Sequence, residues 1–361
     1  MTPLEREIRG IIRRRGPIPV ADYMALALGH PEHGYYRQGD PLGRAGDFIT
    51  APEISQVFGE LVGLWCATTW RRIGAPDPVR LVELGPGRGT LMADALRAAG
   101  MVPGFLAAAD IHLVETSPAL TACQQDALAG RNVTWHKDFA DVPAGPLVLV
   151  ANEFFDALPV QQWVRTGTGW RRRCVGVDGA DGGLRFVLSP RAEDGALEIP
   201  KPVRGAPTGA VFEVCAEGLA LAGAIGTRLA GQGGAALIID YGPAESAAGC
   251  SLQAVRNHAY HPVLSDPGHA DLTAHVDFAA LAHAARHAGA QSFGPVAQGD
   301  FLTGLGIAAR MERLAGGAAP DQARAILAGG RRLIDADAMG TLFKVLALAA
   351  PALPAPAGFE P

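Results

Sequence analysis

The chain has 361 residues, of which 48% are hydrophobic and 19% are charged, and its formal net charge is −5. This length and composition indicate a globular protein with a large core and more than one domain, and they exclude a fibrous or disordered chain. The acidic balance comes without the basic stripe that nucleic-acid-binding proteins present, so we expect no nucleic-acid partner.

The N-terminus leads directly into an amphipathic helical pattern, without the apolar stretch of a secretory signal. The longest apolar runs are far shorter than the ~20 residues that span a bilayer, so we expect no membrane partner. The five cysteines are far apart and form no C-x-x-C pair, which speaks against a zinc site and against a disulfide framework. Together these features predict a cytoplasmic protein that binds no metal.

The chain is expected to fold as three parts. Residues 1–75 predict an N-terminal helical cap whose glycine-rich loop, 44–50, covers the binding site. Residues 76–350 predict the main domain, which carries an insertion of β-hairpins at about 157–210. The proline-rich end, 351–361, is expected to be a disordered tail, because alternating Pro and Ala favour neither a core nor a helix.

Apolar runs suited to strands alternate with helical patterns through the main domain, which is typical of βαβ units and a parallel sheet. The hairpin insertion interrupts this alternation before the fifth strand, and two closing strands follow near the end. The pattern therefore predicts an α/β fold with a mostly parallel sheet. The seven expected strands are Val79–Leu84, Asp110–Val114, Val133–His136, Leu147–Val150, Ala235–Asp240, Gln291–Ala297 and Thr341–Leu348.

The first strand ends in a loop that contains Gly85, Gly87 and Gly89, and a helical pattern begins at once. Glycines are needed where a ligand lies against the backbone, and the amides of a helix N-terminus then face that ligand. A dinucleotide site would read G-x-G-x-x-G, but Thr90 occupies the place of its last glycine. With Glu83 two residues before it, the loop instead resembles motif I of class I S-adenosylmethionine-dependent methyltransferases. The resemblance implies that these glycines and Glu83 bind that cofactor, with the acid near its methionine amino group.

Acidic residues follow the next two strands. Glu115 stands at the carboxyl end of the second strand, where a carboxylate can accept both ribose hydroxyls of an adenosine, although an acid beside a helix N-terminus is favourable in itself. Asp138 follows the third strand, where methyltransferases of this class place a polar residue against the adenine amino group. A carboxylate before a short turn is the structural alternative for Asp138. Both residues are candidates for cofactor binding.

Two carboxylates, an amide and two aromatic rings follow the fourth strand, in residues 152–159. Open α/β sheets bind ligands at this edge. Asn152, Glu153 and Asp156 could hold a cationic nitrogen substrate and orient its lone pair toward a methyl carbon, so they are the catalytic candidates. Capping of a short turn is the alternative for this segment.

Across nearly its whole length the chain resembles the MidA family of methyltransferases, relatives of the mitochondrial complex I assembly factor that methylates an arginine. The resemblance implies a class I Rossmann-like enzyme that takes S-adenosylmethionine and methylates an arginine of a protein substrate. It also implies that Asp47, Thr50 and Glu53 close the cofactor pocket, and that Asp271 and His275 line the same cleft. Without the resemblance, the loop would be a flexible surface turn, and Asp271 could instead cap a helix through Thr273. The segments that carry the resemblance are 46–60, 85–89, 152–159, 239–242, 271–278 and 339–344.

Other functions stay open at this point. A catalytically silent assembly factor or chaperone would keep the fold, although the intact glycine loop and Glu115 argue against it. A small-molecule N- or O-methyltransferase would share the cofactor site, and a nicotinamide enzyme is disfavoured by Thr90. The apolar end strands and the hairpin insertion could pair across a two-fold axis, so a homodimer is a further expectation.

Overall fold

The computed structural model describes residues 1–37, 50–179, 182–192 and 198–360. The chain divides into two compact units, which we call the hairpin unit and the sheet unit. The hairpin unit consists of Met1–Phe48, Asp156–Leu219 and Glu245–Asp277, and the sheet unit of Ile49–Phe155, Ala220–Ala244 and Phe278–Pro361.

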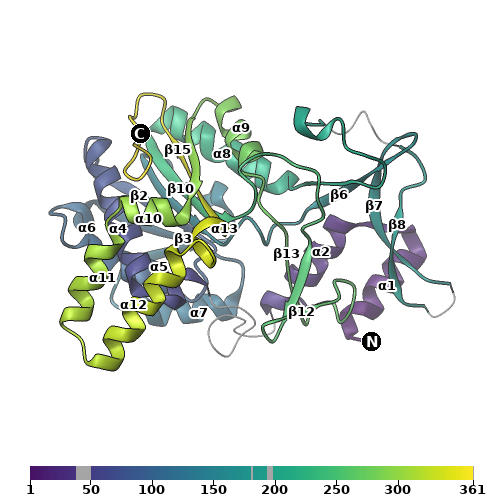
Figure 1. Ribbon diagram of the computed structural model, residues 1–361, viewed down its shortest axis with the longest axis horizontal. Helices are drawn as coiled ribbons and strands as arrows, with labels where there is room; N and C mark the ends of the chain where they lie inside the picture. Colours follow the sequence, from purple (N-terminus) through teal and green to yellow (C-terminus); the bar gives the residue numbers. More distant parts are fainter. Residues whose placement is uncertain (38–49, 180–181, 193–197, 361) are drawn as a thin grey trace. The chain divides into compact units, whose positions relative to one another are not determined.

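A seven-stranded sheet forms the centre of the sheet unit, with the strand order β14-β15-β10-β5-β2-β3-β4 (Figure 1). Neighbouring strands from β10 to β4 pair in parallel, and β15 runs antiparallel between β10 and β14. The Rossmann-like, mostly parallel sheet expected from the sequence is therefore confirmed. Its strands are β2 (Val79–Leu84), β3 (Ala109–Val114), β4 (Val133–His136), β5 (Leu147–Asn152), β10 (Gly234–Tyr241), β14 (Gln291–Ala297) and β15 (Phe343–Ala349).

Helices cover this sheet because successive strand residues point to opposite faces and are apolar on both. Val148 and Val150 of β5, for example, lie in one core cluster with side chains of α4, α5, α10, α11 and α12. The other strand residues between them, such as Leu149, are equally buried and face the opposite side. The helices are α3 (Ala51–Ile54), α4 (Gln56–Arg72), α5 (Thr90–Ala99), α6 (Phe105–Ala108), α7 (Pro118–Ala127), α8 (Ala216–Gln232), α9 (Phe278–His287), α10 (Gln298–Gly304), α11 (Ile307–Gly316), α12 (Pro320–Ile334) and α13 (Met339–Leu342).

Helix α4 departs from the expected organisation, in which residues 1–75 form one cap. It lies in the core of the sheet unit and packs against α5. The two helices approach so closely that a Cβ at Gly63 would lie 2.2 Å from the carbonyl oxygen of Ala95. The small residues on the facing surfaces thus allow a contact that groups α4 with the sheet, so the described structure does not divide at residue 75.

The proline-rich end of the chain also departs from expectation, because it packs against the sheet unit. The indole Nε1 of Trp65 donates a hydrogen bond to the carbonyl oxygen of Ala357 over 3.2 Å. The ring of Phe359 lies 5.5 Å from that of Phe301. Proline prevents helix continuation but not burial of neighbouring apolar groups, so the prediction of a disordered tail is corrected for the described residues, which reach position 360.

The hairpin unit combines the N-terminal helices with antiparallel strands. Helix α1 is capped by the Thr2 hydroxyl, and it buries Leu4, Ile8 and Ile12 at helical spacing. A five-stranded sheet joins β1 to the strands of the expected hairpin region, and a smaller sheet has the order β12-β11-β13. The elements are α1 (Pro3–Arg15), β1 (Ile18–Pro19), α2 (Val20–Gly29), η1 (Tyr35–Arg37), β6 (Gln161–Thr166), β7 (Gly169–Val177), β8 (Leu184–Leu188), η4 (Lys201–Val203), β9 (Val211–Val214), β11 (Gln253–Arg256), β12 (Ala259–His261) and β13 (Asp271–Thr273).

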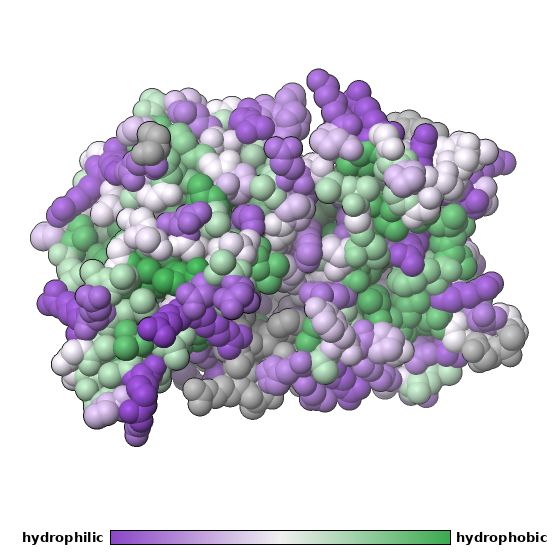
Figure 2. Space-filling view, viewed as in Figure 1, coloured by the Kyte–Doolittle hydropathy of each residue, from purple (hydrophilic) through white to green (hydrophobic). Residues whose placement is uncertain are grey.

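Helices α11 and α12 present polar side chains on the surface of the sheet unit, as amphipathic helices packed on a sheet do. Figure 2 shows many hydrophilic side chains over α11 and α12, and the residues that α12 buries are Gly330 and Leu333. Among the described helices, none combines the length and the apolar character needed to cross a membrane.

Candidate functional site

The glycine loop connects β2 to α5 as the sequence predicts. Gly85, Gly87 and Gly89 have φ angles of +59°, +54° and +83°, in the region that other residues rarely adopt. The N–H of Gly85 donates to the carbonyl of Val114 over 3.1 Å, which ties the loop to the neighbouring strand. Gly89 has no side chain to cap α5. The first amides of that helix are therefore suited to hold a ligand carboxylate.

The segment that follows β5 lies directly against this loop. A Cβ at Gly85 would lie 2.6 Å from Cδ2 of Phe154, so only glycine fits there without displacing the ring. Asp240, fully buried at the end of β10, accepts a hydrogen bond from the N–H of Phe155 over 3.0 Å. The end of β5 and the glycine loop thus form one continuous wall. Asp240 thus holds the backbone of the segment after β5. Sequence analysis gave this residue no role of its own, although it lies in the segment 239–242 that carries the family resemblance.

Glu83 is a buried carboxylate at the end of β2. Its Oε2 has no hydrogen-bond partner among the described residues, and burial raises its pKa to about 8. An orphaned acceptor in such a place is suited to a donor from a ligand. The amino group of S-adenosylmethionine has that chemistry, so the residues present fit the cofactor.

Glu115 follows β3 and has a fixed side chain. Its Oε1 accepts from the N–H of Ser117 over 2.6 Å, and its Oε2 from Nε2 of Gln124 over 3.1 Å. The same Gln124 nitrogen donates to the carbonyl of Gly87 over 2.8 Å, so the helix α7 links the acid to the glycine loop. Sequence analysis missed Gln124. The available signal was a glutamine four positions after Leu120, on the buried side of the helix.

Asp138 follows β4 at an exposed position. Its Oδ1 accepts from the N–H of Ala140 over 2.8 Å and caps a short helix, η2 (Phe139–Asp141). The capping alternative therefore describes what this side chain does in the structure, and its contact with adenine stays a prediction.

Asn152 and Glu153 lie together at the end of β5. Nδ2 of Asn152 donates to Oε1 of Glu153 over 3.2 Å, while the buried Oδ1 has no partner in the described part of the chain. Glu153 has a φ of +48°, which is unusual for a residue with a side chain. Such conformations are retained where the surroundings hold them, most often at binding and catalytic sites.

The segment before α4 reaches the same place. The N–H of Ala51 donates to Oε1 of Glu153 over 2.9 Å, and the Thr90 hydroxyl donates to Oε1 of Glu53 over 2.5 Å. Arg88 of the glycine loop lies 3.9 Å from Glu53 as an ion pair. Thr50 precedes α3, and its carbonyl oxygen accepts from the first turn. The structure thus brings Glu53 to the glycine loop, whereas Asp47 lies outside the described residues.

Asp156 belongs to the hairpin unit, in which it is buried. The hydroxyl of Tyr36 donates to Oδ1 of Asp271 over 3.1 Å. Burial, followed by the charges of Asp271 and Asp156, raises the pKa of the Tyr36 hydroxyl well above its usual value. These two carboxylates therefore lie close enough to Tyr36 to act on it. His275 is exposed, and its N–H donates to the Ser251 hydroxyl over 2.8 Å.

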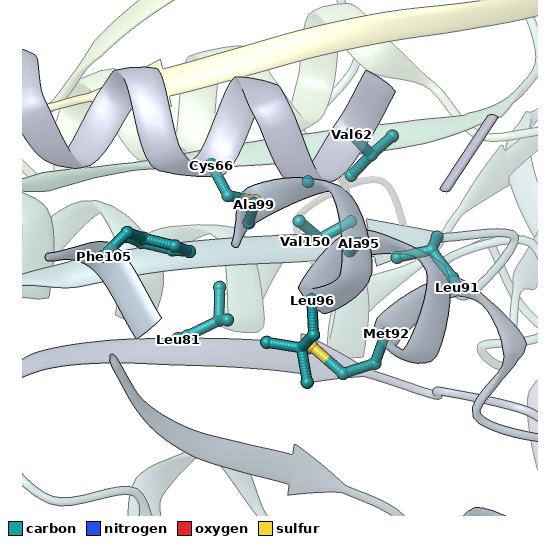
Figure 3. Close-up of a pocket in the computed structure, with 11 residues that line it drawn as sticks. Val62, Cys66, Leu81, Leu91, Met92, Ala95, Leu96, Ala99, Phe105 and Val150 are labelled. Carbon is teal, nitrogen blue, oxygen red and sulfur yellow. The ribbon is translucent and has the colours of Figure 1, made fainter. Parts of the chain in front are cut away.

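A separate pocket in the sheet unit lies between α4, α5 and the sheet (Figure 3). Its lining includes Val62, Cys66, Leu96, Phe105 and Val150 and is apolar throughout. It offers no group that would recognise a ribose or an amino acid, so it is distinct from the cofactor site. In the ranges that the structure describes, no group of His, Cys, Asp and Glu side chains could hold a metal ion.

The parallel sheet with its antiparallel insertion, the glycine loop at a helix N-terminus and the acid after the second strand define a class I S-adenosylmethionine-dependent methyltransferase. Residues 61–296 match the family described as "Putative S-adenosyl-L-methionine-dependent methyltransferase". The chain belongs to this family, so the cofactor expected from the sequence is confirmed.

Relatives and solved structures agree with this assignment. The chain is 40% identical to mouse "Protein arginine methyltransferase NDUFAF7, mitochondrial" and 39% identical to its Drosophila melanogaster homologue, over 96% of this chain and 84% of each relative. A Burkholderia thailandensis protein crystallised with S-adenosyl-homocysteine has a TM-score of 0.83 and 30% identity, over 99% of this chain and 92% of that one. The resemblance to the MidA family and its arginine-methylating relatives is thereby confirmed.

The same comparison corrects the predicted compartment. The relatives from mouse, zebrafish and Drosophila are named as mitochondrial proteins, so the prediction of a cytoplasmic protein is wrong. That prediction depended in part on the scattered cysteines, which indicate a reducing environment but do not distinguish one reducing compartment from another.

Proposed function

We propose that this methyltransferase transfers a methyl group from S-adenosylmethionine to an arginine side chain of a protein. The names of relatives that are about 40% identical over nearly the whole chain support this substrate class. The structural observation that carries the proposal is the carboxylate of Glu153 at the end of β5. It accepts from Asn152 and Ala51, and the next residue, Phe154, lies against the glycine loop.

In this proposal the cofactor site has three parts. The glycine loop, with Gly85, Gly87 and Gly89, and the α5 N-terminus hold the carboxylate of the cofactor, and Glu83 accepts from its amino group. Glu115 accepts from the ribose hydroxyls, and Asp138 lies beside the adenine. The segment that contains Thr50 and Glu53 closes the pocket, a role supported by the contact of Glu53 with Thr90. Asp47, which the sequence places in the same segment, lies outside the described residues.

S-adenosylmethionine supplies a methyl group on a positively charged sulfur, and transfer proceeds by in-line displacement when the nucleophile is aligned. A guanidinium is protonated in water, with a pKa above about 12. A carboxylate beside it both binds the cation and favours loss of its proton as the new N–C bond forms. We assign this role to Glu153, with Asn152 as its orienting neighbour and Asp156 as a second carboxylate.

The test uses protein extract from cells that lack this gene, so that the target is unmethylated. The extract is incubated with the purified protein and tritiated S-adenosylmethionine and then separated into small-molecule and protein fractions. The protein fraction is hydrolysed to amino acids. The proposal predicts labelled methylarginine with the wild-type protein and none with Glu115→Ala, which should not retain the cofactor.

The other outcomes identify the rival functions. Label in the small-molecule fraction, with none in protein, would make the chain a small-molecule methyltransferase. Absence of label in any fraction, together with stable capture of a protein partner, would make it an assembly factor without catalytic activity. Either result overturns the proposal.

A further inference from the structure

Gln124 is a fully buried side chain on helix α7. Its Nε2 donates to the carbonyl of Gly87 over 2.8 Å and to Oε2 of Glu115 over 3.1 Å. Its Oε1 accepts from the indole Nε1 of Trp135 over 2.9 Å. A side-chain amide has two N–H donors, so both are used, and both are used on groups of the predicted cofactor site.

Trp135 fixes the direction of this amide. The indole N–H can only donate, so the oxygen of Gln124 must face Trp135 on β4. The NH₂ group must then face the glycine loop and Glu115. The orientation follows from the chemistry of the three partners and needs no assumption about which amide atom is nitrogen.

Gln124 also fixes Glu115 from a second side. The N–H of Ser117 holds Oε1 of Glu115, while Gln124 holds Oε2. A carboxylate that two donors hold cannot rotate without losing one of them. Helix α7 is close to the loop as well, since a Cβ at Gly89 would lie 3.2 Å from Cα of Gln124.

We infer that Gln124 is a positioning residue for the cofactor, which sets the Glu115 carboxylate and the Gly87 carbonyl in one fixed arrangement for the ribose. This inference rests on the ribose role proposed for Glu115. Gln124 acts through Glu115, so its removal should chiefly weaken binding of ligands that carry ribose hydroxyls. A purely structural role would weaken all adenosine ligands equally.

The test measures calorimetric dissociation constants for S-adenosylhomocysteine and for its 2′,3′-dideoxy analogue. Hydrogen bonds to a charged group correspond to a preference of about tenfold to a hundredfold for the ribose ligand in the wild-type protein. In Gln124→Leu this preference should fall to within about threefold of unity, because Glu115 is no longer held. Affinity for the dideoxy analogue should stay within about threefold of wild type.

Two further variants keep the test decisive if Gln124→Leu does not fold. Gln124→Met keeps the length of the side chain but has no hydrogens for Gly87 and Glu115, and it should lose the preference too. Gln298→Leu is the matched control, because Gln298 is equally buried in the same unit and donates to the carbonyl of Leu333 over 2.9 Å. It should keep the full preference.

The outcomes distinguish a failure of this inference from a failure of the ribose role proposed for Glu115. If the wild-type protein does not distinguish the two ligands, the ribose role of Glu115 fails and the inference fails with it. If the wild-type protein distinguishes them and both Gln124 variants do so equally well, only the role of Gln124 is overturned.

Discussion

The backbone N–H of Ala51 donates a hydrogen bond to Oε1 of Glu153 over 2.9 Å. The N–H of Glu153 itself donates to the carbonyl of Ile239 over 2.9 Å. A left-handed conformation costs a residue with a side chain about 1–2 kcal/mol, and these two contacts hold Glu153 in it. The carboxylate is therefore preorganised at the end of β5, and the segment before α4 is attached to it.

Gly85→Ala tests the contact between the glycine loop and the segment after β5. The alanine would have a strained backbone, with a φ of +59°, and its Cβ would lie 2.6 Å from Cδ2 of Phe154. We therefore expect the free energy of unfolding to fall by about 1–3 kcal/mol. Gly167→Ala is the control, since a Cβ there meets nothing within 4 Å. Urea denaturation checks both variants, and an equal effect of the two would contradict the close approach.

Glu83 predicts a pH dependence of stability in the cofactor-free protein. Burial raises its pKa from 4.5 to about 8, so between these values the unfolded state releases a proton that the folded state keeps. The stabilising contribution is complete below about pH 4.5 and is lost as pH rises toward 8, at up to about 1.4 kcal/mol per pH unit. Glu83→Gln should abolish this part of the slope in urea denaturation at pH 5, 6.5 and 8. An unchanged slope would mean that the folded carboxyl is already ionised.

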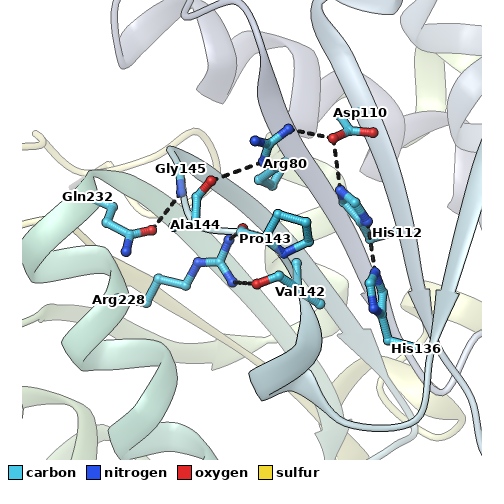
Figure 4. Close-up of polar contacts among 10 residues, drawn as sticks. All are labelled: Arg80, Asp110, His112, His136, Val142, Pro143, Ala144, Gly145, Arg228 and Gln232. Carbon is cyan, nitrogen blue, oxygen red and sulfur yellow. Dashed lines mark hydrogen bonds and ion pairs between the residues drawn. The ribbon is translucent and has the colours of Figure 1, made fainter.

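His112 predicts a loss of stability on the acid side. It is buried beside Asp110 and His136, with Arg80 on the far side of Asp110 (Figure 4). Burial lowers the pKa of His112 from 6.5. The unfolded state therefore binds a proton first as pH falls below about 6.5, and stability is lost at up to about 1.4 kcal/mol per pH unit.

The variant His112→Gln should reduce that acid sensitivity, and thermal unfolding between pH 5 and pH 7 measures it. If stability falls equally steeply with decreasing pH in the variant and in the wild-type protein, groups other than His112 cause the loss of stability in acid.

Local patterns predicted the sheet because its strands are continuous apolar runs. The start of α7 also has a local signal, since the Ser117 hydroxyl accepts from the N–H of Leu120 at the N-cap. The pairing of β1 with β7 could not be predicted, since contacts between distant segments leave no local period.

At the site, glycine spacing and strand-end acids predicted Gly87 and Glu115. The role of Gln124 depends on the fold of α7 against the loop, and the packing of α4 on α5 depends on small residues that meet only in three dimensions. The sequence shows a glutamine four positions after Leu120 and glycines in α4, but it does not show which residues they contact.

The central claim is that Glu153 acts in transfer rather than in cofactor binding, and Glu153→Gln tests it most directly. The amide keeps an oxygen for Ala51 and Asn152, so the variant should fold as the wild-type protein does. Its dissociation constant for S-adenosylmethionine should stay within about threefold of the wild-type value. Labelling of arginine in extract protein should fall at least about 100-fold, while Glu312→Gln, an exposed change on α11, should label normally. Labelling by Glu153→Gln at the wild-type rate would contradict the account.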